Sequence, residues 1–323
     1  MFCVVFAGTF AASLEPLVRT HVKTPCQVQV SDERDVIARL PEADALVTMA
    51  FSPAMGAVAT RLKLIQVPGA GLDRIDRSAV PAWTALANVY GHEIGIAEYV
   101  LGAILALTRE FVRLDGALRR GIWESQWAPG VPPPPVWPEL AGKTLGIVGH
   151  GRIGQSLARR ARAFDMTVLG IRRDTTRSDP NATVCGPDAL EEVLARADAL
   201  AITAPLTAET RGLLGERELS AMKPTAVLVN VSRAEIVDED ALYVALAERR
   251  IAAAALDVWY RYPTSAGPTW PAHRAFHELP NVLMTPHVSG WTEGMLQARA
   301  SLIAANIDRV ARGEPPLNLI PSS

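Results

Sequence analysis

Three glycines within residues 149–154 (GHGRIG) have the spacing of a dinucleotide phosphate loop. The apolar residues 144–148 lead directly into it, and a helix-forming stretch starts inside it. Gly149 permits a tight turn, Gly151 lets the backbone approach a phosphate, and Gly154 lets the helix pack closely against the strand. This order brings backbone N–H groups and a helix N-terminus to one point, where a pyrophosphate can bind. The residues expected to contact the dinucleotide here are Gly149, Gly151, Arg152, Ile153 and Gly154.

The end of the next predicted strand, residues 167–171, indicates which nicotinamide coenzyme is bound. NAD sites usually carry an Asp or Glu there, which accepts hydrogen bonds from the adenosine ribose. Arg172 and Arg173 follow the strand instead, and a guanidinium would bind a 2′-phosphate bidentately. Asp174 is the counter-evidence, because a shift of two residues would restore an acid. We expect NADP(H) to be favoured over NAD(H); the alternative is two solvated arginines with no role in coenzyme binding.

Repeated strand–helix units surround this loop, and they predict an α/β fold with a doubly wound parallel sheet. A smaller α/β unit precedes them, with helical patterns over residues 34–40 and 54–61. A last helix, residues 293–312, is placed to return to that first unit, so the dinucleotide-binding domain would be an insertion. Strands are predicted at residues 3–7, 45–49, 64–67, 144–148, 167–171, 199–203, 226–230, 252–256 and 282–284.

Two domains follow from this division of 323 residues. Residues 1–95 with 291–323 would form a substrate domain, and residues 96–290 the dinucleotide-binding domain. The second domain would open with an apolar helix over residues 96–109 and an arm ending in a run of four prolines. Such a run excludes helix and inner strand, so we expect the arm to be extended and, together with the apolar helix, to form a dimer contact over about residues 96–140.

Composition excludes several classes of function. The formal charge is −2 with acids and bases mixed, and this predicts no nucleic-acid partner. Three cysteines without a CxxC pair argue against a disulfide framework and favour the cytoplasm. The apolar residues 1–14 lack a preceding basic residue, and residues 94–108 include Glu98, so no membrane association is expected. His273 and His277 have a metal-ligand spacing but no third ligand nearby, so no metal site is expected.

Several further motifs occur in an order that resembles the D-isomer-specific 2-hydroxyacid dehydrogenase family over nearly the whole chain. They comprise residues 69–76 (GAGLDRID), 97–98 (AE), the loop at 149–154, 205–207 (PLT) with 209–210 (ET), 222–224 (MKP), 230–233 (NVSR), 256–258 (LDV) and 285–287 (TPH). The resemblance implies a Rossmann-type coenzyme domain inserted into a smaller, flavodoxin-like α/β substrate domain. It also implies glyoxylate/hydroxypyruvate reductase-like chemistry and, more distantly, a likeness to formate dehydrogenases.

The resemblance further implies roles for single residues in reducing a 2-oxo acid. Arg233 would clamp and polarise the substrate, and His287 would be the general acid in reduction and the base in oxidation. Backbone N–H groups of Ala70 and Gly71 would hold the carboxylate, and Asp257 would orient the nicotinamide carboxamide. The remaining coenzyme contacts implied are Arg173, Ala204, Pro205, Thr210, Val231, Ser232, Ser289 and Gly290.

The sequence departs from the family at the partner of the catalytic histidine. That partner is normally a glutamate, but Tyr262 occupies its position. A phenol can hydrogen-bond His287 but supplies no charge at neutral pH, so we expect a pKa near the unperturbed value of about 6.5. The alternative is that Tyr262 is a pocket wall and another acid serves His287. The glutamine of formate dehydrogenases is also missing, and His92 replaces their substrate-gripping asparagine, which argues against formate.

Two functions remain open at this point. The first is a homodimeric reductase, preferring NADP(H), of a 2-oxo acid such as glyoxylate or hydroxypyruvate. The second is a dinucleotide-sensing binding protein like the corepressors that resemble this family. The aromatic and polar residues that suggest the substrate pocket are Phe51, Tyr90, His92, Tyr262 and Trp291.

Overall fold

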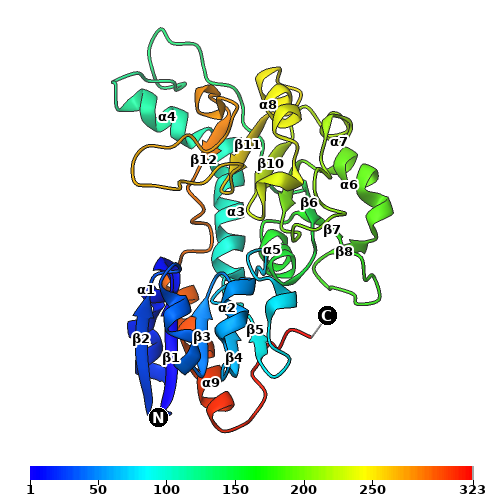
Figure 1. Cartoon of the computed structure of the whole chain (residues 1–323). Helices are drawn as coiled ribbons and strands as arrows, with labels where there is room; N and C mark the ends of the chain where they lie inside the picture. The colour runs from blue at the N-terminus through cyan, green and yellow to red at the C-terminus, as the bar shows by residue number, and fades with distance from the viewer. Residues whose placement is uncertain (322–323) are drawn as a thin grey trace. The chain divides into compact units, whose positions relative to one another are not determined.

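The computed structural model describes residues 1–321, which divide into two compact units (Figure 1). The first unit contains Met1–His92 and residues 291–321, and the second contains Glu93–Gly290. The boundary predicted at residue 95/96 therefore falls within a helix that begins at Glu93. Within residues 1–321, no helix combines the length and the hydropathy needed to span a bilayer.

The first unit is built on a parallel sheet of five strands (Figure 1). The strands are β1 (Phe2–Ala7), β2 (Cys26–Ser31), β3 (Ala45–Thr48), β4 (Leu64–Gln66) and β5 (Ala85–Ala87). Their order, β2-β1-β3-β4-β5, is the flavodoxin-like order that was expected. The helices are α1 (Thr9–His21), α2 (Pro53–Val58) and α9 (Glu293–Ala311), with short 3-10 turns at Val36–Ala38, Leu40–Glu42 and Arg77–Ala79.

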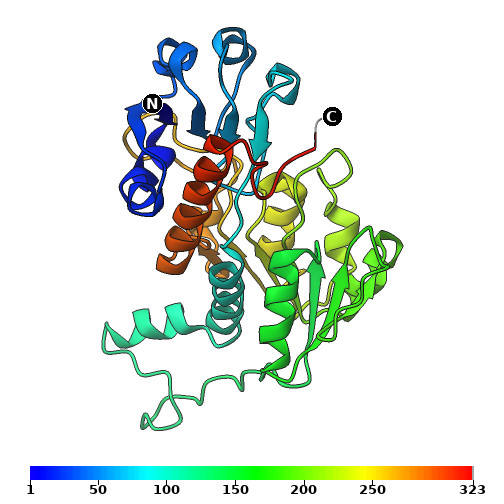
Figure 2. The ribbon, with the colours of Figure 1, turned by 90° about the horizontal axis from the view of Figure 1, so that it is seen from below.

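Alternation along β1 gives this sheet two apolar faces. Val4 and Phe6 pack into a core with α1 and α9, which contact each other although they lie at opposite ends of the chain (Figure 2). Cys3 and Val5 point to the other face, where α2 and the 3-10 turns cover the sheet. Burial on both faces explains why these strands read as continuous apolar runs.

The second unit is built on a parallel sheet of seven strands (Figure 1). The strands are β6 (Thr144–Val148), β7 (Thr167–Ile171), β8 (Thr183–Cys185), β9 (Ala199–Ile202), β10 (Val227–Asn230), β11 (Ala253–Leu256) and β12 (Val282–Met284). Their order is β12-β11-β10-β9-β6-β7-β8, so the sequence reverses direction in space between β6 and β9. This is the switch point of a Rossmann-type sheet, beside which dinucleotides bind. The prediction of a doubly wound α/β fold is confirmed.

Helices cover both faces of the second sheet. The helices of this unit are α3 (Glu93–Thr108), α4 (Phe111–Leu118), α5 (Arg152–Arg162), α6 (Leu190–Arg196), α7 (Glu216–Ser220) and α8 (Glu239–Ala247), with 3-10 turns at Pro187–Ala189, Ala234–Ile236 and Phe276–Glu278. The core under α3 and α5 contains Leu145 and Ile147, whereas the core under α6, α7 and α8 contains Leu200 and Ile202. After α4 the chain runs without regular structure until β6, as the extended loop that both ribbon views show (Figures 1 and 2).

In each sheet an aspartate lies at the amino end of a central strand; Asp44 is buried and Asp198 is partly buried. Asp44 precedes β3 and accepts the N–H of Cys3 at 2.9 Å; Asp198 precedes β9 and accepts the N–H of Thr144 at 2.8 Å. Each carboxylate thereby joins the beginnings of two neighbouring strands. Burial opposes the charge of each, but the hydrogen bonds and basic neighbours outweigh it and lower the pKa of both. The basic partners are Arg61 and Lys223.

Candidate active site

The phosphate loop has the backbone geometry that its glycines predict. Gly149 has φ 98°, and a Cβ there would lie 2.2 Å from the backbone nitrogen of Ala204, so only glycine fits this turn. A Cβ at Gly151 would meet nothing within 4 Å, so the backbone faces open space just before α5 begins at Arg152. Gly154 packs closely against the Gly149 carbonyl. A helix N-terminus, open space and a close turn together fit a dinucleotide pyrophosphate.

Arg172 lies at the end of β7 and is partly buried, whereas Arg173 and Asp174 are exposed. The buried Nε and Nη2 atoms of Arg172 have no hydrogen-bond partner among the described residues. An unpaired buried guanidinium is costly, so its nitrogens suit an anionic ligand. The Asp174 carboxylate instead accepts hydrogen bonds from the backbone and hydroxyl of Thr176, at 3.0 and 2.5 Å. Those bonds lower the pKa of Asp174 and occupy it in its own turn.

The other predicted coenzyme contacts of this unit lie after β9 and β10. Thr210 donates its hydroxyl to the Pro205 carbonyl at 2.7 Å, and this bond closes the turn that follows β9. Ser232 donates to the carbonyl of Ala204, and this bond connects the ends of the two strands. Ala204 and Val231 are buried. All these residues follow the carboxyl ends of parallel strands, where ligands of open α/β sheets bind.

Arg233 begins a 3-10 turn directly after β10. Its Nη1 donates to the carbonyl of Ser232 at 2.8 Å, and its own carbonyl accepts the Nδ2 of Asn230 at 3.0 Å. These local bonds fix the backbone from which the guanidinium projects. Asn230 is 1% exposed and was recognised in the sequence only as part of a motif; the structure shows that it holds the turn.

Tyr262 and His287 lie in contact, with the Tyr262 hydroxyl 2.7 Å from Nδ1 of His287. A hydroxyl can donate to neutral Nδ1 or accept from a protonated one, so this contact suits both charge states of the imidazole. Neither state gains an opposite charge from it. The geometry places the two residues together as the Tyr262 pairing predicted, and places no carboxylate in the glutamate position.

The pKa of His287 is lowered from its ordinary value of 6.5. Surrounding protein desolvates the charged imidazole and is the main cause, although part of the ring remains open to solvent. The charge of Asp257 opposes this shift and that of Arg233 adds to it. Burial also raises the pKa of Tyr262, so this phenol stays neutral beside the histidine. The expectation of a pKa near about 6.5 is therefore corrected downwards, because the desolvation was invisible in the sequence.

Asp257 holds the loop that carries His287. Its carboxylate is fully buried and accepts the N–H groups of Val288 and Ser289 at 2.8 Å each, and the hydroxyl of Thr285 at 2.6 Å. His287 itself has φ 58°, a left-handed conformation that costs a non-glycine residue about 1 kcal/mol or more. The three bonds to Asp257 stabilise this turn. A role of Asp257 toward the nicotinamide carboxamide stays a prediction.

Two residues that the sequence did not single out support the same loop. Tyr99, on α3, donates a hydrogen bond to the Thr285 hydroxyl at 2.6 Å. That hydroxyl in turn donates a hydrogen bond to the carboxylate of Asp257. Trp259 donates its Nε1–H to the Thr285 carbonyl at 2.8 Å. Tyr99 lies 186 positions from Thr285, and no short motif could have indicated that contact.

The predicted substrate residues of the first unit lie after its own strands. Ala70 and Gly71 follow β4 in a turn whose Ala70 carbonyl accepts the Nδ2 of Asn88 at 3.0 Å. His92 is 7% exposed, and its Nδ1 lies 3.1 Å from Nη2 of Arg299 on α9. Because a guanidinium only donates, Nδ1 of His92 accepts and the ring hydrogen lies on Nε2.

Aromatic residues extend this group, but not all those expected take part. Trp291 is half exposed, and its ring centroid lies 5.8 Å from that of Phe10 on α1. The Arg299 guanidinium lies over the Phe10 ring, 5.6 Å from its centroid. Neither Phe10 nor Arg299 had been singled out. Phe51 is 1% exposed and belongs to the apolar core beside β1, so its expected place in a pocket wall is wrong.

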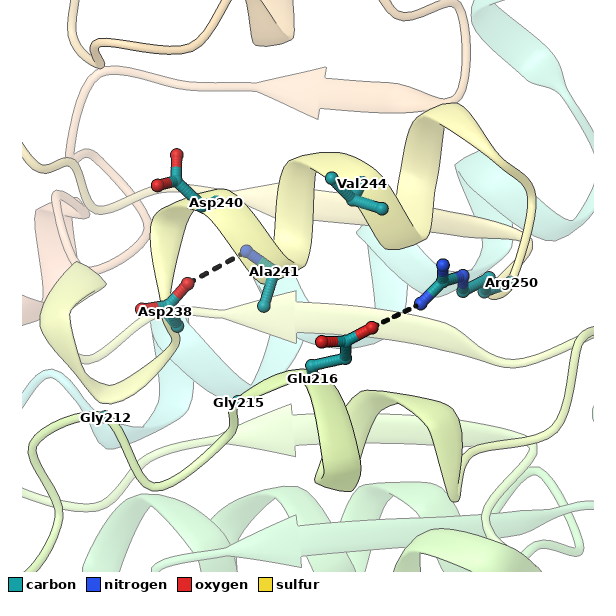
Figure 3. A pocket seen from close by; sticks show the side chains of 8 residues that line it. All are labelled: Gly212, Gly215, Glu216, Asp238, Asp240, Ala241, Val244 and Arg250. Carbon is teal, nitrogen blue, oxygen red and sulfur yellow. Dashed lines mark hydrogen bonds and ion pairs between the residues drawn. The ribbon is translucent and has the colours of Figure 1, made fainter.

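A cavity of about 430 Å³ opens between α7 and the first turns of α8 (Figure 3). Its charged groups already have partners: Asp238 caps α8 through the N–H of Ala241, and Glu216 pairs with Arg250. Asp240 pairs with Arg274. The residues that line it are Gly212, Gly215, Glu216, Asp238, Asp240, Ala241, Val244 and Arg250. None of the predicted site residues lies among them.

The histidine pair with metal-ligand spacing does not lie on one helix. His273 contacts Glu239 at 3.1 Å, and the His277 ring stacks on Trp270 with centroids 3.8 Å apart. Across residues 1–321, no group of three or more His, Cys, Asp or Glu side chains could hold a metal ion.

Comparison with known proteins places the chain in one family. Residues 101–289 match the family described as D-isomer specific 2-hydroxyacid dehydrogenase, NAD binding domain. A glyoxylate reductase of Thermofilum pendens is 34% identical over 318 residues, which are 93% of this chain and 89% of that protein. A D-3-phosphoglycerate dehydrogenase of Methanocaldococcus jannaschii is 34% identical over 297 residues, 89% of this chain, but the chain spans only 53% of that relative.

A solved structure supports the same assignment. The D-isomer specific 2-hydroxyacid dehydrogenase from Xanthobacter autotrophicus Py2, in complex with NADPH and MES, superposes with a TM-score of 0.80 at 25% identity, covering 99% of this chain and 98% of that chain. These likenesses favour an enzyme over the dinucleotide-sensing alternative. The chain therefore belongs to the D-isomer-specific 2-hydroxyacid dehydrogenase family and is an NAD(P)-dependent oxidoreductase that transfers a hydride.

Proposed function

We propose that the chain reduces a small 2-oxo acid, such as glyoxylate or hydroxypyruvate, with NADPH. The substrate class comes from relatives named glyoxylate reductase that align over nearly the whole chain. The observation that carries the chemistry is the His287–Tyr262 contact of 2.7 Å beside a loop fixed by Asp257. A titratable group on a rigid, partly desolvated loop is what proton transfer to a carbonyl oxygen requires.

The proposed roles follow the residues of each unit. The bound coenzyme supplies the hydride from its nicotinamide ring. In the second unit, Arg233 polarises the substrate carbonyl, and Nε2 of protonated His287 gives its proton to the carbonyl oxygen while Nδ1–H is held by Tyr262. In the first unit, the N–H groups of Ala70 and Gly71 hold the carboxylate. His92 and Trp291 contact the remainder of the substrate and limit its size.

Preference for NADPH rests on Arg172. Its buried Nε and Nη2 lack partners among the described residues, and a 2′-phosphate would satisfy both in a bidentate arrangement. Arg173 is exposed beside it and adds positive charge. Asp174, the residue that would favour NADH, is already engaged with Thr176. The relative from Xanthobacter autotrophicus was itself solved with NADPH.

Steady-state rates with glyoxylate, hydroxypyruvate and phenylpyruvate, each against NADPH and NADH, test both parts. We expect a higher kcat/KM with NADPH, and Arg172→Gln should lower that value about tenfold while leaving NADH within about twofold. Arg196→Gln, on exposed α6, is the matched control. A wild-type preference for NADH contradicts the coenzyme assignment. Tight coenzyme binding without turnover of any 2-oxo acid contradicts the reaction.

We further propose that the chain is a cytoplasmic homodimer. The segment from α4 to β6 exposes large apolar side chains, including Trp127 at 81% and Val136 at 99%. Such a surface is costly to leave in water and suits an interface between copies. All three cysteines are free, which suits a reducing compartment. Light scattering should give twice the chain mass, and a monomer at micromolar concentration would contradict the dimer.

A further inference from the structure

His150, the second residue of the phosphate loop, is an imidazole with no exposed surface. Its backbone N–H and that of Gly149 both donate to the carbonyl of Ile171, at 2.7 and 3.0 Å. This position needs no titratable group for contact with a pyrophosphate, which backbone N–H groups and the helix N-terminus bind. The buried ring therefore calls for a different explanation.

The sheet leaves room for this ring by having no side chain at Gly170. A Cβ on Gly170, in β7, would lie 2.5 Å from Cγ and Nδ1 of His150. Gly170 has no left-handed backbone that would itself demand glycine. The glycine is thus explained by the close approach of the imidazole, which packs against β7 at this position.

The far side of the ring reaches the segment that follows β7. Nε2 of His150 lies 2.8 Å from Oδ2 of Asp179, whose side chain is 7% exposed. The other oxygen, Oδ1, accepts the backbone N–H of Asn181 at 2.8 Å, and Asp179 forms an isolated bridge with Ala182. Hydrogen bonds from Asn181 and His150 outweigh burial and lower the pKa of Asp179, so the carboxylate is ionised and Nε2–H donates to it.

Asp179 and Arg172 lie at the two ends of one exposed loop. Arg172 is tied to the sheet by its N–H, which donates to the Cys185 carbonyl at 3.0 Å. Residues 173–178 between the two are exposed and include Arg173 and Arg177. The His150–Asp179 bond therefore anchors the far end of the segment whose basic residues face solvent, and it anchors it to the phosphate loop itself.

We propose that His150 and Asp179 form a buried positioning pair that makes the enzyme selective for the 2′-phosphate of its coenzyme. The pair fixes the position of the 172–179 loop relative to the backbone that binds the pyrophosphate. The guanidinium of Arg172 then binds the 2′-phosphate without the entropy cost of ordering the loop. NADPH therefore binds more tightly than it would to a disordered loop. This inference rests on the proposed preference for NADPH. NADH lacks the 2′-phosphate, so its binding does not use the loop.

The test measures dissociation constants of NADPH and NADH by coenzyme fluorescence for wild type, His150→Phe and Asp179→Asn. Phenylalanine fills the ring space but cannot bond Asp179; asparagine keeps the volume but has one acceptor oxygen for two donors, Nε2–H of His150 and the N–H of Asn181, so one of the two bonds is lost. Both variants should bind NADPH about tenfold more weakly and NADH within about twofold of wild type. Asp188→Asn, exposed in the same unit, is the control and should bind both coenzymes as wild type does.

Two readouts separate a positioning role from general damage. The double variant should bind NADPH no more weakly than the weaker-binding single variant, because both substitutions disrupt the same attachment of the loop at residue 179. Hydrogen exchange at the amides of residues 173–182 should accelerate in both single variants, while the amides of β6 keep their protection. If His150→Phe does not fold, Asp179→Asn carries the same expectations alone.

The outcomes also distinguish this inference from the proposed function. Wild type that binds NADH as tightly as NADPH overturns the proposed coenzyme preference, and this inference with it. A wild-type preference for NADPH that survives both substitutions overturns only the inference. Equal weakening of NADPH and NADH binding also overturns it, because that result means that the phosphate loop itself is damaged. It would not indicate displacement of the 172–179 loop.

Discussion

Tyr262 replaces a charge with a dipole at the partner position of His287. A carboxylate there would stabilise the imidazolium, whereas the phenol hydroxyl can turn to donate or accept as the ring changes state. The histidine therefore keeps its orientation in both directions of the reaction. Tyr262 itself contributes no charge that would stabilise the protonated imidazole. Desolvation then lowers its pKa without opposition from that side.

The pH dependence of reduction follows from this pKa. Reduction needs protonated His287, so its rate falls as pH rises through a value below 6.5, and oxidation shows the reverse trend. Tyr262→Glu should raise the pKa by about one to two units and carry reduction to correspondingly higher pH. The measurement is kcat against pH with saturating NADPH. Tyr262→Phe is the control and should not shift the profile upwards; an unchanged profile in Tyr262→Glu would refute the pairing.

The residues of this site differ in how far the sequence could reveal them. Arg233, His287 and Tyr262 could be placed because each belongs to a short motif or stands at a fixed distance from one. Tyr99 and Arg299 could not, since each acts on a residue about 200 positions away and has no local signal. Asp179 was equally hidden, because its partner His150 looks like a variable position in a glycine loop.

The loop of residues 285–289 shows how an element holds strain for function. His287 adopts a left-handed conformation, and three hydrogen bonds to Asp257 keep it there. Without those bonds the turn would relax toward ordinary backbone angles and carry the imidazole with it. Asp257 is thus a positioning residue in this structure, whatever it also does for the coenzyme.

Asp257→Asn should release this loop. An amide in place of one oxygen faces an N–H donor, so a bonded pair becomes a repulsion that costs about 1–3 kcal/mol. We expect kcat to fall about a hundredfold or more, and the His287 pKa to fall further, because the Asp257 charge now raises it. A pH–rate profile of the variant checks both effects. Asp240→Asn, an exposed position on α8, should behave as wild type, and a variant of Asp257 with normal kcat would refute the role.

At the scale of elements, the predicted strands were found, including the edge strand β12, but three other edge strands were missed. β2 and β8 were missed because their residues are polar or half exposed and give no apolar run, and β5 because it has only three residues, two of them alanine. Residues 34–40, expected as a helix, form two 3-10 turns instead, and Pro41 lies in the second. A proline removes a donor and clashes with the preceding turn, so a regular helix could not continue through it.

In the molecule as a whole, the amino ends of both sheets depend on ionised aspartates. Asp44 and Asp198 have pKa values below the ordinary 3.8, so each stabilises its folded unit at pH values above about 4. That stabilisation is lost as pH falls through the lowered folded values. Because the two carboxylates share no partner, their effects should add.

Calorimetry of single and double variants checks this. Asp44→Asn and Asp198→Asn should each lower the free energy of unfolding at pH 7 by about 1–3 kcal/mol, and the differences from wild type should shrink as the pH falls below the ordinary pKa of 3.8. Asp188→Asn is the exposed control. A loss that stays constant down to pH 2 would mean that packing, rather than charge, explains these residues.

The phenol beside His287 also bears on acid balance around the enzyme. Reduction of a 2-oxo acid by NADPH takes up one proton for each hydride, so every turnover in that direction removes acid. With a histidine that is protonated only in acidic surroundings, turnover accelerates when protons are abundant and slows when they have been consumed. A carboxylate partner would flatten that response across the neutral range. With Tyr262 in its place, the proposed reduction would limit itself, because it consumes the protons that its own rate requires.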